Sequence, residues 1–251
     1  MHAKKSLGQN FLKSEPALRK IVEAGEIEKS DIILEIGPGR GALTTKLLEK
    51  AKTVVAVEKD GELFEFLKKK FEKEIVGGKL NLLNKDILDF DFGEENYKVI
   101  ANIPYNITGA ILKKFLTAKN QPASMVLMVQ NEVAKRIVAR DGKESILSIS
   151  VKAYGQPKMI MKVPARYFSP APKVDSAIIA IKEISRKFFK ENGINERHFW
   201  EIVRAGFAHK RKKLSSNLKS IKNYNKNGNG IELENKRAEE LTISDWIPLL
   251  K

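Results

Sequence analysis

Cysteine is absent from the 251 residues of this chain, and histidine occurs only at positions 2, 198 and 209. Without cysteine the protein has no disulfide framework, no thiolate zinc site and no cysteine nucleophile. The three histidines lack the spacing of metal ligands, so we expect neither a zinc hydrolase nor any bound metal. The missing cysteine also suits a cytoplasmic protein.

Long apolar runs are missing as well. No stretch approaches the roughly 20 apolar residues that a membrane-spanning helix needs. Residues 1–13 contain no apolar segment of the kind found in a secretory signal. We therefore expect a cytoplasmic protein with no membrane partner.

Acidic residues are absent from two segments of a chain whose formal net charge is +15. Residues 202–231 contain eight Lys or Arg and no acid, and residues 1–13 add three lysines. Such a run can be a solvated helix face, but an acid-free segment of this length favours a surface that binds phosphates. The candidate phosphate-binding residues are Lys4, Lys5, Arg204, Lys210, Arg211, Lys212 and Lys213.

Apolar residues make up 42% of the chain, enough for a substantial core, and their pattern alternates between strands and helices. Strands are predicted at 32–36, 53–57, 80–83, 98–101 and 123–129, with a closing pair at 159–163 and 176–184. Helices are predicted at 14–25, 42–51, 61–74, 107–117 and 132–139. Residues 145–154 fit either a helix or a strand. Repeated strand–helix units predict an α/β fold with a mostly parallel, doubly wound sheet.

The pattern changes near residue 184. Beyond it, helices are predicted at 197–208, 210–219 and 238–250, with an Asn/Gly-rich loop at 223–230. We therefore predict two domains, a sheet domain over 1–184 and a small basic helical domain over 185–251.

A glycine-rich motif, Glu35-Ile36-Gly37-Pro38-Gly39-Arg40-Gly41, lies where the first sheet strand turns into a helix. Glycines there let the backbone approach a ligand, and Glu58 at the end of the next strand can accept hydrogen bonds from ribose hydroxyls. The spacing also satisfies a dinucleotide fingerprint. The acid ahead of the first glycine favours S-adenosylmethionine, whose ammonium and sulfonium groups attract carboxylates.

Asp86, just after the third strand, is a candidate acceptor for the adenine amino group of such a cofactor. Taken alone, it could equally be an ordinary loop residue.

The second motif, Asn102-Ile103-Pro104-Tyr105, follows the fourth strand. An exocyclic adenine amine is a poor nucleophile because its lone pair is delocalised into the ring. The side-chain oxygen of Asn102 and the carbonyl of Ile103 can both accept hydrogen bonds from the amine and direct its lone pair at a methyl group. Pro104 restricts the residue before it to an extended conformation, and Tyr105 can stack on an extruded base.

Four segments together resemble the ribosomal RNA adenine dimethyltransferase family. They are Lys5-Ser6-Leu7-Gly8-Gln9-Asn10-Phe11-Leu12, the glycine motif, Asn102–Tyr105, and the stretch from Pro164 to Ser176. The resemblance implies a class I methyltransferase fold and S-adenosylmethionine as cofactor. The cofactor-binding residues that it implies, together with the residues noted above, are Asn10, Leu12, Glu35, Gly37, Gly39, Gly41, Glu58, Asp86 and Asn102.

The resemblance also implies the residues at the target base. Asn102 polarises the amine with the help of Pro104, while Tyr105 and Phe168 form two aromatic walls around the base. Without the family, Phe168 would be read as a core aromatic. The basic residues of the C-terminal domain bind RNA in this reading, although Lys210-Arg211-Lys212 departs from the family, which usually has two arginines before the lysine.

The form of two segments, 7–12 and 207–214, is more similar to the small-subunit branch of the family. That branch dimethylates the N6 amines of two adjacent adenosines in the 3′-terminal hairpin of small-subunit (16S) rRNA during subunit assembly. The partners implied are this rRNA and the pre-assembled small subunit, and we expect a monomer. The alternatives are a large-subunit methyltransferase of the macrolide-resistance type and an assembly factor with incidental turnover. An NAD oxidoreductase is disfavoured because no histidine lies within the strand–helix repeats.

Overall fold

The fold is described from a computed structural model, which covers residues 4, 7–94, 96–221 and 236–250. The predicted loop at 223–230, Lys5, and Lys222 and Lys226 of the acid-free segment lie outside the described residues. Within the described residues, no helix is long and apolar enough to cross a membrane.

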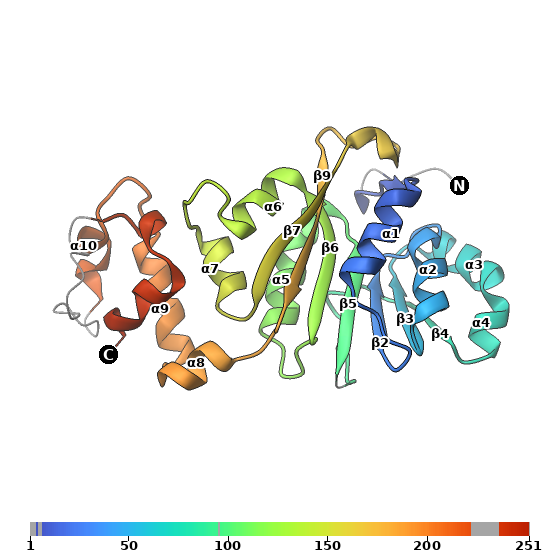
Figure 1. Ribbon diagram of the computed structural model, residues 1–251, viewed down its shortest axis with the longest axis horizontal. Coiled ribbons are helices and arrows are strands. Elements are labelled where there is room, and N and C mark those ends of the chain that lie inside the picture. The colour runs from blue at the N-terminus through green and yellow to red at the C-terminus, as the bar shows by residue number, and fades with distance from the viewer. Residues whose placement is uncertain (1–3, 5–6, 95, 222–235, 251) are drawn as a thin grey trace. The chain divides into compact units, whose positions relative to one another are not determined.

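A seven-stranded sheet forms the centre of the chain, as the sequence predicts (Figure 1). Its strand order is β4-β3-β2-β5-β6-β9-β7, with β9 antiparallel to both of its neighbours and the other pairings parallel. The strands are β2 (Ile32–Ile36), β3 (Thr53–Glu58), β4 (Leu80–Asn84), β5 (Tyr97–Asn102), β6 (Ser124–Gln130), β7 (Gln156–Val163) and β9 (Ser176–Lys182). Because β2 lies between β3 and β5, the strand order reverses at β2, and α/β proteins bind ligands at the carboxyl ends of the strands beside such a reversal.

Helices lie between the strands as predicted, with one difference. They are α1 (Glu15–Ala24), α2 (Ala42–Lys50), α3 (Gly61–Lys70), α4 (Glu72–Val76), α5 (Thr108–Leu116), α6 (Asn131–Val138) and α7 (Ile146–Lys152). The single helix predicted over 61–74 is interrupted at Phe71, which separates α3 from α4. The ambiguous segment 145–154 is helical because Ser145 and Ser148 form a reciprocal capping box.

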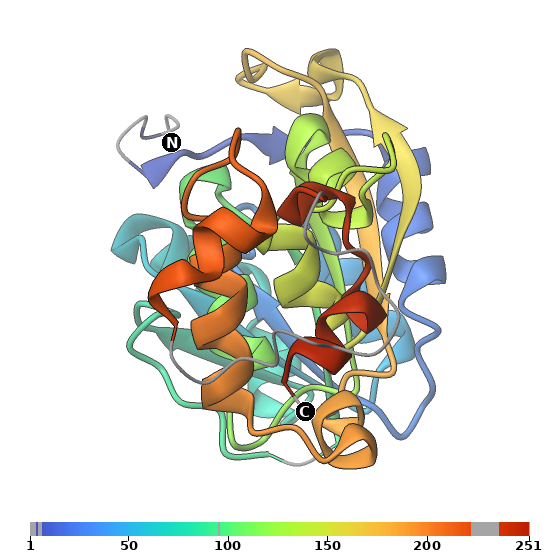
Figure 2. The same ribbon diagram turned by 90° about the vertical axis from the view of Figure 1, so that its left-hand side faces the viewer.

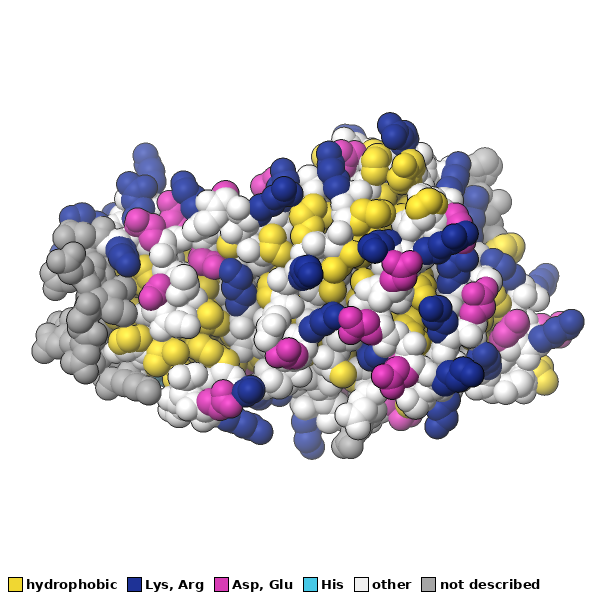
Figure 3. Space-filling model, in the orientation of Figure 1, with side chains coloured by type: hydrophobic (Ala, Val, Ile, Leu, Met, Phe, Trp, Pro, Cys, Tyr) yellow, Lys and Arg dark blue, Asp and Glu magenta, His cyan; other side chains and the backbone are white. Residues whose placement is uncertain are grey.

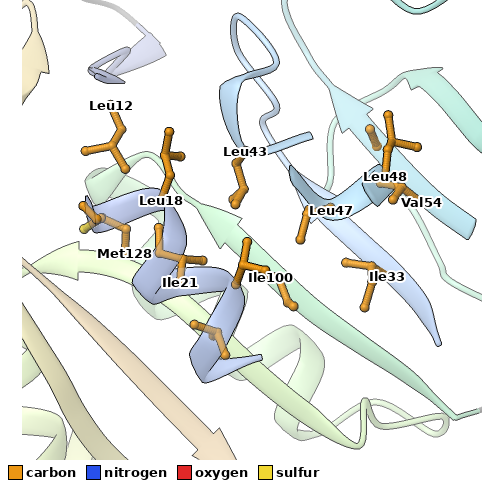
Figure 4. Packing of buried hydrophobic residues seen from close by; sticks show 14 of the residues in the cluster. Leu12, Leu18, Ile21, Ile33, Leu43, Leu47, Leu48, Val54, Ile100 and Met128 are labelled. Carbon is orange, nitrogen blue, oxygen red and sulfur yellow. The ribbon is translucent and has the colours of Figure 1, made fainter. Parts of the chain in front are cut away.

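The core on one face of the sheet is built from apolar side chains of α1 and α2 (Figure 4). Ser14 caps α1, and the helix buries Leu18 and Ile21 on one side. These side chains point toward Ile100 of β5 and Met128 of β6. Helix α1 is therefore packed against β5 close to Asn102, where the second sequence motif begins.

The described chain separates into two compact units, Met1–Ala134 with Gln156–Ile184, and Lys135–Gly155 with Ser185–Lys251. The limit at Ile184 is the one proposed from the sequence. The segment 135–155, placed in the first domain by that prediction, belongs to the second unit. It includes α7 and Tyr154, whose ring packs against Phe189 and Trp200 of the same unit.

The second unit contains α7, α8 (Lys187–Asn192), α9 (Glu196–Gly206) and α10 (Leu214–Asn217), with 3-10 helices η4 (Leu218–Ser220), η6 (Ala238–Glu240) and η7 (Ile243–Leu249) (Figure 2). The helices predicted at 210–219 and 238–250 are shorter in the structure. The first begins only at Leu214, as α10 followed by η4, and the second is divided into the 3-10 helices η6 and η7. Pro248 lies inside the second and cannot donate the hydrogen bond that an α-helix needs there. Trp246 of η7 is buried against Phe207, and a side chain at Gly206 would clash with it.

Candidate functional site

A cavity of about 370 Å³ opens at the carboxyl ends of the parallel strands. Its size falls in the range of small-molecule sites. Most of the predicted ligand and catalytic residues line it, namely Asn10, Leu12, Glu35, Gly37, Gly39, Glu58, Asp86, Asn102, Pro104 and Tyr105. Gly41 and Phe168 are not among the described residues of its wall.

The glycine motif is a tight turn from β2 into α2. Gly37, Gly39 and Gly41 all have positive φ, near 64°, 61° and 76°. At Gly41, which begins α2, a Cβ would lie 2.5 Å from the Phe71 ring. Gly41 therefore serves the packing of α2, whereas Gly37 and Gly39 present backbone to the cavity.

Glu58, at the end of the neighbouring strand β3, stabilises the glycine turn by a hydrogen bond. One carboxylate oxygen accepts a hydrogen bond from the Gly39 amide at 3.1 Å, and the other accepts from the Asp60 amide at 2.9 Å. Burial raises the pKa of Glu58, and these backbone hydrogen bonds oppose the rise. The Lys59 amide is a third backbone donor to this carboxylate. A carboxylate offers about four acceptor sites, so Glu58 can still accept a hydrogen bond from a ligand hydroxyl.

Glu35 is a buried carboxyl group, 1% exposed, in the cavity wall. Among the described residues, its Oε2 atom has no hydrogen-bond partner. Burial raises the pKa of Glu35 to about 8. A buried carboxyl group in the cavity wall with one oxygen left without a partner is suited to a cationic group of a ligand, such as an ammonium.

Asp86 lines the cavity beyond β4 and remains ionised. A hydrogen bond from Lys59 Nζ, 2.7 Å from Oδ2, lowers the pKa of Asp86, and the Leu88 amide donates to Oδ1 at 2.9 Å. Both oxygens keep lone pairs that could accept from an amino group.

The Asn102 side chain is oriented by the N-terminal segment. Its Nδ2 donates to the backbone carbonyl of Asn10 at 3.3 Å. Because a carbonyl can only accept, this bond assigns the amide nitrogen to that side and leaves Oδ1 as an acceptor. Pro104 follows in an extended conformation, with φ −60° and ψ 132°.

Tyr105 begins the 3-10 helix η2 (Tyr105–Ile107), and its hydroxyl is hydrogen-bonded to Ser176 Oγ at the start of β9. Burial raises the pKa of Tyr105, so the hydroxyl is un-ionised near neutrality. Sequence reasoning did not single out Ser176, although it ends the proline-containing motif.

The N-terminal segment forms one wall of the cavity. Strand β1 (Phe11–Leu12) pairs with β8 (Phe168–Ser169), which places Leu12 opposite Phe168. Phe168 is 3% exposed and packs in the hydrophobic cluster that also contains Leu12. Its role as a wall of the target-base slot stays a prediction.

The predicted phosphate-binding residues differ in their surroundings. Lys4 is paired with Asp60 and Glu62, which neutralise its charge. Arg204 and Lys210–Lys213 are exposed, and His209–Lys212 line a surface hollow. On the face drawn in Figure 3, basic side chains are scattered among acidic ones, so net charge alone does not locate a nucleic-acid surface there. Among the described residues, no three His, Asp or Glu side chains gather as a metal site requires.

Comparison with known proteins gives matches along the whole chain. The family model for ribosomal RNA adenine dimethylase matches residues 1–251. Proteins named ribosomal RNA small subunit methyltransferase A are similar, one from Dehalococcoides mccartyi (42% identical, over 98% of this chain and 87% of that protein) and one from Fusobacterium nucleatum (40%, over 99% and 96%).

Solved structures show the same class I methyltransferase fold. A dimethyladenosine transferase from Plasmodium falciparum superposes with a TM-score of 0.81 at 29% identity, covering 96% of each chain. The 23S rRNA methyltransferase ErmE, at 24% identity and a TM-score of 0.80 over 96% of this chain and 98% of its own, shares the fold. From the full-length family match and these relatives, we conclude that the chain belongs to the ribosomal RNA adenine dimethylase family.

Proposed function

We propose that this protein dimethylates the N6 amines of two adjacent adenosines in the 3′-terminal hairpin of small-subunit rRNA, with S-adenosylmethionine as methyl donor. The relatives named small subunit methyltransferase A, about 40% identical over nearly the whole chain, support the substrate class. The observation that carries the proposal is Asn102, whose amide is oriented by the Asn10 carbonyl so that Oδ1 can face an amine.

The cavity fits the proposed cofactor. Glu35 offers a buried carboxyl group for the ammonium, Glu58 offers acceptors for the ribose hydroxyls, and Asp86 offers one for the adenine amino group. When bound, S-adenosylmethionine supplies a methyl group activated by its sulfonium. The positive φ values at Gly37 and Gly39 favour glycine, which leaves the space that the cofactor needs free of side chains.

At the target base, the protein residues position the amine. No side chain has to act as a general base and take a proton from the amine in the transition state. In the first transfer, Asn102 Oδ1 and the Ile103 carbonyl accept hydrogen bonds from the two N–H groups, which directs the nitrogen lone pair away from the purine ring. In the second transfer one N–H remains to donate, and after each transfer the nitrogen releases one proton to solvent. Tyr105 stacks on the base, with its hydroxyl anchored to Ser176. Catalysis then rests on positioning two reactants, with no covalent enzyme intermediate.

The second unit is proposed to bind rRNA in the pre-assembled small subunit, through Arg204 and Lys210–Lys213. These side chains are exposed on a stretch without acids. The monomeric state expected from the sequence stays part of this proposal.

The proposal is tested by a transfer assay with labelled S-adenosylmethionine. Small subunits that lack the hairpin modification and bare large-subunit rRNA serve as parallel acceptors, and digested nucleosides are identified by mass. We expect dimethyladenosine from the small subunit only. Label in the large-subunit RNA alone would contradict the branch, and cofactor binding without transfer would favour an assembly factor.

The same assay with Asn102→Ala tests the polarisation step. We expect kcat to fall by about 100-fold or more, since removing one preorganised transition-state group typically costs that much. Wild-type turnover by this variant would contradict the role of Asn102.

A further inference from the structure

Asp60 joins three parts of the chain, namely the N-terminal segment, the end of β3 and the start of α3. It is 4% exposed and lies two residues beyond Glu58. Oδ1 accepts from the Glu62 amide at 3.0 Å and from Lys4 Nζ at 3.0 Å, while Oδ2 accepts from Gln9 Nε2 at 2.9 Å. Its own amide donates to Glu58 at 2.9 Å. Asp60 therefore links the proposed ribose acceptor with the N-terminal segment.

The side chain of Gln9 connects Asp60 with the backbone of the N-terminal segment. Its side-chain oxygen accepts from the Lys4 amide at 2.8 Å, while its side-chain nitrogen donates to Asp60. Both atoms of the amide are thus engaged, which fixes the segment beside the start of α3.

The residues after Gln9 lie along the cavity as far as the proposed catalytic asparagine. The carbonyl of Asn10 accepts from Asn102 Nδ2, and the Phe11 ring lies so close to Gly39 that a Cβ there would be 3.1 Å from it. Leu12 then pairs with Phe168. One short segment, residues 7–12, thus connects the cofactor side of the cavity with the amine side.

Helix capping explains only part of this arrangement. An N-cap carboxylate needs one oxygen to accept a hydrogen bond from the first turn, which Oδ1 does with the Glu62 amide. The second oxygen is used for Gln9 instead. Burial alone would raise the pKa of Asp60, but the hydrogen bonds from Gln9, Lys4 and the Glu62 amide, with the charge of Lys4, together lower it.

We propose that Asp60 is a positioning residue, which acts through Gln9 to hold residues 7–12 against the methyl-donor cavity and so orients Asn102. The inference rests on the proposed function, because the donor and the amine are those named above. Without the Gln9–Asp60 bond the segment leaves the wall more readily, so the donor site loses part of its wall and the Asn102 amide loses its orienting carbonyl.

Gln9→Ala tests this without removing the α3 cap. The probe is S-adenosylhomocysteine, titrated calorimetrically into the full-length protein. We expect its Kd to rise about tenfold, as for one hydrogen bond to a charged group, and kcat for methyl transfer to fall as well. In the protein alone, amide hydrogen exchange over residues 7–12 should become faster. Gln156→Ala is the matched control, since Gln156 also donates to a carboxylate, that of Glu183, on an exposed part of the sheet.

Asp60→Asn and the double variant complete the test. If Gln9 acts through Asp60, the double variant binds S-adenosylhomocysteine no more weakly than the worse single variant. Additive losses, or a Gln9→Ala protein with wild-type Kd and exchange, would overturn the proposal. A wild type that binds the probe but methylates neither RNA would overturn the proposed function alone, since the tenfold difference in Kd would still support the role of Asp60. A wild type that does not bind the probe would overturn both.

Discussion

At the scale of single residues, Glu35 places an ionisable group where water cannot reach it. Its pKa is about 8 in the folded protein, against 4.5 for an ordinary glutamate. As pH rises from 4.5 toward 8, the unfolded chain loses this proton and the folded chain keeps it. Glu35 therefore lowers the free energy of unfolding across that window, by about 1.4 kcal/mol per pH unit.

Glu35→Gln should consequently stabilise the protein at pH 8 relative to the wild type and change little at pH 4.5. Denaturant unfolding at both pH values measures the difference. A gain of the same size at both would contradict the role of ionisation.

The same carboxyl group predicts proton release on ligand binding. At pH 7 the free protein holds Glu35 largely protonated, and an ammonium beside it favours the ionised form. Binding of S-adenosylhomocysteine should release close to one proton, measured by calorimetry in two buffers of different ionisation enthalpy. Glu35→Gln should bind more weakly and release none from this site. Equal proton release by both proteins would rule out Glu35 as the source.

Ser176 holds the hydroxyl of Tyr105, the residue proposed to stack on the target base. It is buried, and its hydroxyl is the partner of Tyr105. Ser176→Ala leaves the tyrosine hydroxyl without that partner, at a cost of about 1–2 kcal/mol, so stacking of the target base should weaken by roughly 5- to 30-fold. We expect KM for RNA to rise while the Kd for S-adenosylhomocysteine stays unchanged. Ser150→Ala, which removes a helical hydroxyl bonded to Leu147, is the control.

At the scale of elements, the start of α2 depends on Gly41, which is not among the described residues of the cavity wall. Gly41 has φ +76° and lies against the Phe71 ring. Gly41→Ala should lower the free energy of unfolding by about 2–4 kcal/mol, from left-handed strain plus overpacking. Gly109→Ala, on an exposed turn of α5 with open space around it, should cost nothing or stabilise slightly. Chemical denaturation of both variants measures the contrast, and equal losses would contradict it.

The central strands could be predicted from sequence because they are buried on both faces. Met125–Val129 in β6, for example, is a continuous apolar run. The C-terminal unit was harder, because its segments are short and capped locally. The ribbon of β1 with β8 could not be predicted, since two-residue strands leave no periodic pattern.

In the candidate site, too, some residues could be predicted from the sequence and others could not. Gly37, Glu58 and Asn102 could be predicted because each lies at or just beyond the end of a parallel strand, and parallel strands bring their carboxyl ends to one edge. Asp60 and Gln9 could not, since their contact depends on where the chain places its N-terminal segment. The one available signal was local, namely Asp60 immediately before α3, and it indicates only a helix cap.

At the scale of the whole molecule, the basic side chains differ in whether their positive charge is available to bind RNA. Lys4 is neutralised by Asp60 and Glu62, so it should contribute little to RNA binding. Lys210, Arg211 and Lys212 are exposed, and none of them forms an ion pair within the described part of the chain. A phosphate that they contact displaces counterions rather than a protein carboxylate.

This difference predicts how RNA affinity depends on salt. Replacing Lys210, Arg211 and Lys212 together by glutamine should weaken binding of small-subunit rRNA and reduce the slope of log affinity against log salt by about 0.7–0.9 per lost contact. Fluorescence anisotropy between about 50 and 200 mM salt measures both. The control replaces Lys50, Lys52 and Lys73, exposed lysines of the first unit, and changes the net charge equally. If net charge alone attracted the RNA, the two triple variants would lose the same slope. A loss confined to the first triple variant would locate the RNA contact in the acid-free segment.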